Sequence, residues 1–264
     1  MEYAHDNRFV LVGMKSGDAK ETIWKTDGSA ITPILTIKNG FVYGASSEKI
    51  LTSQSNPEGY SLKDLHKSTQ SIKLLYSDGK PVTGIIRANF SPDGNELAIT
   101  TSENTQDVLW RVKYGKLISL AKKNAWACWS YDNKKLAYHV LSAHKVVVMD
   151  ISSGKNEYYH LGILDPWFPG EFSPNGSQIL MTNDSASDSH AVFHIDLKTR
   201  KATDVTPVSW KNDELQSFPF VQWAGNGKHI IFSTDLRFRP YVGIYISNSD
   251  GSNFHEITFH AITK

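Results

Sequence analysis

Four times along this chain, an aromatic residue is followed by a polar corner and then by a short apolar run. The first example reads ANFSPDGNELAITT, from Ala88 to Thr101. The four aromatic residues are separated by 39, 43 and 51 residues, and periods of about 40 to 50 residues are typical of repeated units such as propeller blades or helical pairs. These aromatic residues are Phe90, Trp129, Phe172 and Trp223.

The runs between the corners have the length and composition of β-strands. After the first corner come ELAIT, DVLWRV and LISLA, which are short and rich in β-branched and aromatic residues. Polar turns separate them, and no stretch carries the apolar stripe of an amphipathic helix. Together with the run that carries the aromatic residue, each repeat supplies four strands, which favours a propeller blade over a helical pair.

The corner itself predicts a tight reversal between the first and second strands of each repeat. Pro92 presets the backbone angle favoured at the second position of a turn, and the side chain of Asp93 can bond back to the backbone. Gly94 supplies the left-handed conformation that lets the next strand return. The second repeat lacks this glycine, so we expect Asn133 to take the left-handed conformation there.

The rest of the chain can be divided in the same way. A four-strand repeat runs from about Gly40 to Asp78, and only three strand-like runs precede it. After the last repeat the chain continues as FHAITK, residues 259–264, which is one more short strand. If this segment completes the first repeat, six repeats close into a ring. The sequence therefore predicts an all-β fold, a six-bladed β-propeller of four-stranded antiparallel blades whose ring is closed by the C-terminal strand, as a single domain over residues 1–264.

The net charge limits the classes of partner to be expected, and the cysteine content limits the disulfides that can form. The chain of 264 residues has a net charge of +1, which gives no electrostatic reason to expect nucleic acid as a partner. Its one cysteine, Cys128, cannot form a disulfide within the chain. No apolar run approaches the roughly 20 residues that span a bilayer, and the start has no signal-peptide pattern. We expect a monomer without a membrane span.

The repeats resemble those of TolB-type β-propellers. The last repeat carries the matching features Trp223, Asn226-Gly227, Ile244-Tyr245, Asp250-Gly251 and Ile257-Thr258. The resemblance implies the fold and leaves the function open. Related blades occur in a periplasmic protein that contacts a lipoprotein and colicins, in the propellers of prolyl oligopeptidase-type peptidases and in a sugar-polymer lyase. It also implies a periplasmic or secreted location if a signal has been removed, and otherwise a cytoplasmic one.

The motifs of common catalytic and metal sites are absent from the sequence. There is no Gly-x-Ser-x-Gly elbow, no His-Glu-x-x-His and no Cys-x-x-Cys, so we expect no metal and no cofactor. Cys128 lies between two tryptophans and is interpreted as a buried packing thiol. His190 and His194 are expected on one strand, where residues four apart are about 13 Å apart, too far to share an ion.

Propeller loops gather at one face around the channel, and function grafted on such folds sits in loops. The loops between strands two and three, and between blades, supply exposed aromatic and basic residues that are typical of interfaces. We therefore predict a non-catalytic scaffold that binds a protein or peptide there. The alternative is a propeller enzyme, or the propeller part of one, that acts on a carbohydrate or peptide with channel residues and a bound metal. The candidate binding residues are Arg87, Trp126, His144, Asp165, Trp167, His190, Phe218, Arg237 and Arg239.

Overall fold

The fold of the chain was obtained as a computed structural model. It describes residues 9–14, 20–26, 31–38, 42–46, 48–55, 58–65, 71–103, 106–113, 115–122, 126–140, 145–160, 166–184, 190–207, 220–225, 227–235 and 242–257. The described residues form 23 β-strands and no helix. The prediction of an all-β fold is therefore confirmed.

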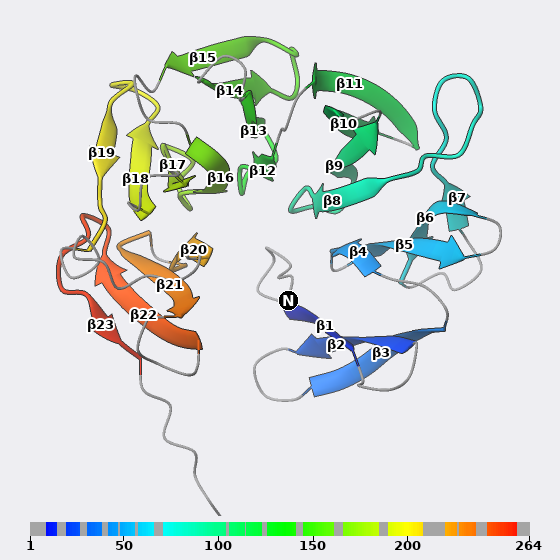
Figure 1. Ribbon diagram of the computed structural model, residues 1–264, viewed down its shortest axis with the longest axis horizontal. Coiled ribbons are helices and arrows are strands. Elements are labelled where there is room, and N and C mark those ends of the chain that lie inside the picture. The colour runs from blue at the N-terminus through cyan, green and yellow to red at the C-terminus, as the bar shows by residue number, and fades with distance from the viewer. Residues whose placement is uncertain are drawn as a thin grey trace, which may run out of the picture. The chain divides into compact units, whose positions relative to one another are not determined.

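The chain folds into two compact units, Met1–Trp129 and Ser130–Lys264. In the first unit, a three-stranded sheet has the order β1-β2-β3, and two four-stranded sheets have the orders β4-β5-β6-β7 and β8-β9-β10-β11 (Figure 1). The strands of this unit are β1 (Phe9–Met14), β2 (Lys20–Thr26), β3 (Ile31–Lys38), β4 (Val42–Ala45), β5 (Lys49–Ser55), β6 (Glu58–Asp64), β7 (Ser71–Lys73), β8 (Ile85–Phe90), β9 (Glu96–Glu103), β10 (Gln106–Lys113), β11 (Lys116–Lys122) and β12 (Ala127–Trp129).

The remaining strands complete three more four-stranded sheets, with the orders β12-β13-β14-β15, β16-β17-β18-β19 and β20-β21-β22-β23. Strands that follow one another in the chain are neighbours in each sheet and pair antiparallel. These strands are β13 (Lys135–Val140), β14 (Lys145–Asp150), β15 (Asn156–His160), β16 (Pro166–Phe172), β17 (Gln178–Asp184), β18 (His190–Asp196), β19 (Ala202–Asp204), β20 (Phe220–Trp223), β21 (His229–Asp235), β22 (Val242–Asn248) and β23 (His255–Glu256).

The repeated corners form the turns between the first two strands of their sheets, as predicted. The backbone N–H of Gly94 donates to the carbonyl of Ser91 at 2.8 Å, and Gly94 has a φ of 67°. The side chain of Asp93 bonds back to the backbone, because its Oδ1 accepts from the N–H of Asn95 at 3.0 Å. Asn133 has a φ of 60°, which confirms that it takes the left-handed conformation where glycine is missing.

A buried serine fixes three of the four corners, and the sequence reading missed its role. The Oγ atoms of Ser91, Ser130 and Ser173 accept from the backbone N–H five residues later, at 2.9, 2.8 and 2.9 Å respectively. Each hydroxyl also donates to the Asp or Asn side chain two residues later. These bonds satisfy buried polar groups inside the turn. The fourth corner has Ala224 at this position and lacks the hydroxyl.

Within the first unit, neighbouring sheets approach each other closely where one side chain is missing. A Cβ added to Gly44 on β4 would lie 2.9 Å from the backbone oxygen of Ala88 on β8. No real Cβ tolerates that distance, so a side chain at residue 44 would force the two strands apart. The glycine therefore allows the first strands of two successive sheets to pack directly against each other.

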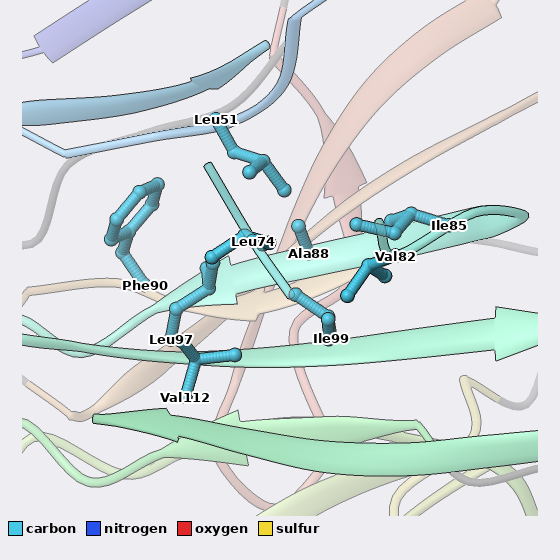
Figure 2. Packing of buried hydrophobic residues seen from close by; sticks show 9 residues of the cluster. All are labelled: Leu51, Leu74, Val82, Ile85, Ala88, Phe90, Leu97, Ile99 and Val112. Atoms are coloured by element: carbon cyan, nitrogen blue, oxygen red, sulfur yellow. The ribbon is translucent and has the colours of Figure 1, made fainter. Parts of the chain in front are cut away.

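The core lies between the sheets. In the first unit, nine buried residues from β5, β8, β9, β10 and the segment 74–82 pack together (Figure 2). A second cluster forms in the second unit around Trp223 and Phe232. The aromatic residues that mark the sequence repeat, Phe90, Trp129, Phe172 and Trp223, are all buried. The periodic aromatic residue is therefore a core position of the repeated sheet.

The first sheet has three strands among the described residues, as the sequence indicated, while the proposed closing segment 259–264 lies outside them. The placement of Trp167 in a loop was wrong, because Trp167 belongs to β16, which begins at Pro166. Prolines cannot donate ladder hydrogen bonds, and the pairing of β16 with β17 continues past Pro166 and Pro169 through two irregularities in register.

Candidate functional site

Two of the predicted binding residues meet where neighbouring strands begin. Arg87 is the third residue of β8, and Trp126 directly precedes β12. The guanidinium carbon of Arg87 lies over the ring of Trp126, and both side chains are half-buried. The face of an indole ring attracts a cation and holds the planar guanidinium in one orientation. We call these two residues the Arg87–Trp126 pair.

Hydrogen bonds between β8 and β12 fix the position of this pair. The side-chain nitrogen of Asn89 donates to the carbonyl of Ala127 at 2.7 Å, and the indole N–H of Trp129 donates to the carbonyl of Asn89 at 2.9 Å. Asn89 follows Arg87 by two residues, and Ala127 follows Trp126 directly. The two strands therefore hold the arginine and the indole ring together through bonds that do not involve either side chain.

The Arg87–Trp126 pair belongs to the end of the sheet that also carries the β9–β10 hairpin. The N–H of Ser102, near the end of β9, donates to the carbonyl of Gly84 at 2.8 Å, just before β8 begins. The hydroxyl of Tyr60 accepts from the N–H of Ile85 at 3.2 Å and anchors the first residue of β8. In this sheet, the segment entering the first strand and the hairpin between strands two and three lie at one end, as predicted.

Burial and a neighbouring carboxylate act in opposite directions on the charge of Arg87. Burial lowers the pKa of Arg87 to about 10, and the negative charge of Asp107 on β10 opposes this change. Arg87 remains protonated at neutral pH, but part of its hydration has been lost. A partly desolvated cation beside an aromatic face interacts strongly with an approaching anion. The pair is therefore suited to recognising a carboxylate.

A second polar cluster lies in the second unit, around Glu171 on β16. This carboxylate is 8% exposed; it accepts a hydrogen bond from the hydroxyl of Tyr131 and another from the backbone N–H of Trp223 at 2.8 Å. Burial raises the pKa of Glu171, although both hydrogen bonds work against that rise. The imidazole of His194 stacks on Trp223, with ring centroids 6.3 Å apart. Glu171 therefore connects residues of three sheets from a buried position.

The other predicted binding residues are described in part or not at all. Trp167 lies in β16 and His190 begins β18, and only their backbone is described. His190 and His194 share β18, as expected. His144, Asp165, Phe218, Arg237 and Arg239 lie outside the described residues. Their role in binding stays a prediction.

The described residues also bear on the expectations about chemistry. Cys128 is buried in β12, which agrees with its interpretation as a packing thiol. In the described part of the chain, no group of three or more His, Cys, Asp or Glu is placed to hold a metal ion. Across the same residues, no helix is long and apolar enough to cross a membrane.

Sequence reasoning missed two residues that connect sheets, Asn89 and Glu171. Both stand directly before the repeated aromatic residue, and the other two repeats have Cys128 and Gln222 at that position. Polar residues recur there among otherwise apolar strand positions, which was an available signal. Their partners lie 38 and 52 residues further along the chain, so no local pattern could identify them.

No protein-family model and no curated protein sequence matches the chain. Solved structures do match. The TolB protein of Acinetobacter baumannii is 18% identical, with a TM-score of 0.59 over 92% of this chain and 61% of that one. The β-propeller domain of the trilobed protease of Pyrococcus furiosus, described as having an open velcro topology, is 15% identical, with a TM-score of 0.61 over 96% of this chain and 81% of that one.

An oligogalacturonate lyase in complex with manganese also matches, at 13% identity and a TM-score of 0.58, over 95% of this chain and 72% of that one. The chain thus spans less than two thirds of the length of the Acinetobacter baumannii protein. At these identities the likeness concerns the fold alone, since propellers of one architecture carry different functions. Together with the repeated four-stranded sheets, it shows that the chain has a TolB-like β-propeller fold.

Proposed function

We propose that this protein is a non-catalytic binding scaffold that recognises a protein or peptide at the sheet end formed by β8, β12 and the β9–β10 hairpin. The observation that carries the proposal is the Arg87–Trp126 pair, which is half-buried and whose strands are joined by hydrogen bonds from the side chains of Asn89 and Trp129 to backbone carbonyls. Tryptophan and arginine are the residues most often found to dominate binding energy at protein interfaces. Pre-positioning reduces the entropy that such side chains lose when a partner binds.

The surroundings of the pair indicate what the partner offers. Ile86, the extra residue at the irregularity between Ile85 and Arg87, is 47% exposed beside the pair. A bulged residue is left outside the ladder and is available for other contacts. A peptide that brings a carboxylate to Arg87 and an apolar side chain to Trp126 and Ile86 fits this arrangement. Such a partner is typical of peptide recognition by Arg-containing sites.

Selection of peptides from a random display library on the whole chain tests this proposal. We expect selected peptides to be enriched in acidic and apolar residues, and to bind Arg87→Gln and Trp126→Leu at least roughly tenfold more weakly, because hot-spot side chains contribute that much. Arg200→Gln is the matched control, because Arg200 also lies over an aromatic ring, that of Tyr159, at 5.4 Å. Equal binding to all four proteins, or a library without binders, would refute the proposal.

The same proposal includes a six-bladed ring, closed when residues 259–264 add a fourth strand to the sheet β1-β2-β3. Support comes from the strand count, since the other five sheets have four strands each and this one has three among the described residues. Closure removes sheet edges that can pair with other chains. The open velcro topology of the Pyrococcus furiosus propeller is the competing arrangement.

A further inference from the structure

We propose that the outer edge of β11 is a second docking surface, which takes an extended acidic segment of another protein as an added strand. This surface belongs to the sheet β8-β9-β10-β11, of which β11 forms one edge (Figure 1). It is separate from the Arg87–Trp126 pair, because β8, which carries Arg87, is the opposite edge strand of the same sheet. The inference does not depend on the function proposed for that pair.

The length of β11 sets it apart from the last strands of the other four-stranded sheets. β11 has seven residues, whereas β7, β15, β19 and β23 have three, five, three and two. Edge strands of monomeric proteins are usually kept short because unpaired backbone groups invite another strand to pair. Among the last strands of the four-stranded sheets, β11 is therefore the exception, and binding of an extended partner would account for its length.

Apolar side chains are exposed around this edge. Ile118 on β11 is 47% exposed, Ile72 on β7 is 54% exposed, and Leu75 after β7 is 40% exposed. Ile72 and Leu75 lie beside the start of β11, because Ile72 is 3.2 Å from the ideal Cβ position of Gly115 and Leu75 forms a β-bridge with Lys116. Ile118 follows Lys116 by two residues on β11. These three residues are half of the six large apolar residues most exposed in the described part of the chain. An added strand would cover such side chains.

One residue of the chain itself already pairs with the outer edge of β11. Leu75, which lies outside the strands, forms an isolated parallel bridge with Lys116, the first residue of β11. The chain then turns away, because Leu75 also pairs with Pro81 and the N–H of Tyr76 donates to the carbonyl of Lys80 at 2.9 Å. The bridge shows that backbone from outside the sheet can pair with the first residue of β11. Residues Leu117–Lys122 continue the edge beyond it.

The charges on β11 indicate the chemistry of the partner. Exposed Lys116 and Lys122 stand at its two ends, with the run LISLA between them. Glu96 does not supply a counter-charge, because it is held by Arg111 and Lys113. In an antiparallel pair with a second copy of β11, Lys116 would face Lys122 at both ends, and like charges directly opposite are destabilising. An apolar segment flanked by Asp or Glu is complementary instead.

The test uses the whole chain and two seven-residue peptides, matched to the length of β11. The acidic probe is acetyl-Glu-Val-Thr-Ile-Thr-Val-Glu-amide, and the basic probe has lysine in place of both glutamates. Binding is measured by titration at low salt, and its location by amide hydrogen exchange of residues 116–122. We expect the acidic probe to slow exchange in β11 and to bind more tightly than the basic one.

A charge-reversed variant, Lys116→Glu with Lys122→Glu, provides the decisive comparison, because both changes are at exposed positions that leave the core intact. We expect it to bind the acidic probe roughly three- to tenfold more weakly and to favour the basic probe, as cross-strand charge pairs require. In Arg87→Gln, the acidic probe should still slow exchange of residues 116–122 as it does in the unmodified chain, which separates this site from the Arg87–Trp126 pair. Unchanged preference in the reversed variant, no protection of β11, or protection that rises with protein concentration alone would overturn the proposal.

Discussion

At the scale of single residues, the left-handed corner of the first repeat is more constrained than its counterparts. Gly94 has a φ of 67° and Gly176 a φ of 68°, so alanine is strained at both. Only at Gly94 would the new Cβ also meet a fixed atom, the Oγ of Ser46 at 2.8 Å. That hydroxyl cannot rotate away without loss, because it accepts from the N–H of Lys49 at 2.9 Å.

We therefore expect Gly176→Ala to lower the free energy of unfolding by about 1 kcal/mol, and Gly94→Ala to lower it by roughly 1 to 3 kcal/mol more. Urea unfolding of the two variants and the unmodified chain measures the difference. Gly176→Ala is the matched control, since nothing lies within 4 Å of its added Cβ. Equal losses would mean that the contact with Ser46 does not limit the corner.

The buried carboxylate of Glu171 leads to a second prediction at this scale, which concerns the dependence of stability on pH. Burial raises the pKa of Glu171 in the folded protein above its ordinary value of 4.5. At a pH between these two pKa values, the carboxyl group is protonated in the folded protein and ionised in the unfolded chain. This contribution to stability is complete below pH 4.5 and is lost as the pH rises through the raised pKa. Glu171→Gln cannot titrate and still offers an oxygen to the N–H of Trp223. We expect the variant to gain stability relative to the unmodified chain between pH 4 and pH 8.

Chemical denaturation across that pH range gives the measurement. Glu157→Gln serves as control, because the side chain of Glu157 is 52% exposed on β15. The control should follow the unmodified chain over the whole range. A stability difference for Glu171→Gln that stays constant with pH would show that the carboxylate does not titrate in this window.

At the scale of elements, the sequence predicts what is determined locally and misses what joins one repeat to the next. Corner, strand length and strand order follow from turn residues and alternating apolar runs, which act within a few residues. The prediction for Asn133 succeeded for that reason. The links made by Asn89 and Glu171 depend on which sheets become neighbours, and the start of β16 at Pro166 depends on a ladder that tolerates two prolines. Neither is set by local sequence.

In the candidate site, too, the features set by local sequence could be predicted and the links between repeats could not. A rule about loops predicted Arg87 and Trp126 on one loop face, and the structure brings them into contact. The rule was wrong about the element that carries Arg87, which lies in β8 and not in a loop. It could not predict that Asn89 holds their strands together, because that bond crosses between repeats. The sequence also could not identify the edge of β11 as a docking surface. Ile118 is exposed because β11 lies at the edge of its sheet, and the composition of the strand does not reveal that position.

At the scale of the whole molecule, the proposed closure makes the last prediction. If residues 259–264 complete the sheet β1-β2-β3, deleting them removes a strand and opens the ring, and melting should occur roughly 5 to 10 °C lower, the shift expected for a few kcal/mol in a chain of this size. Replacing the segment with six Gly and Ser residues should be equally damaging, because pairing and not chain length is required. Hydrogen exchange should then rise first in β1, β2 and β3. Identical melting of the full and shortened chains would instead favour the open velcro topology described for the Pyrococcus furiosus propeller.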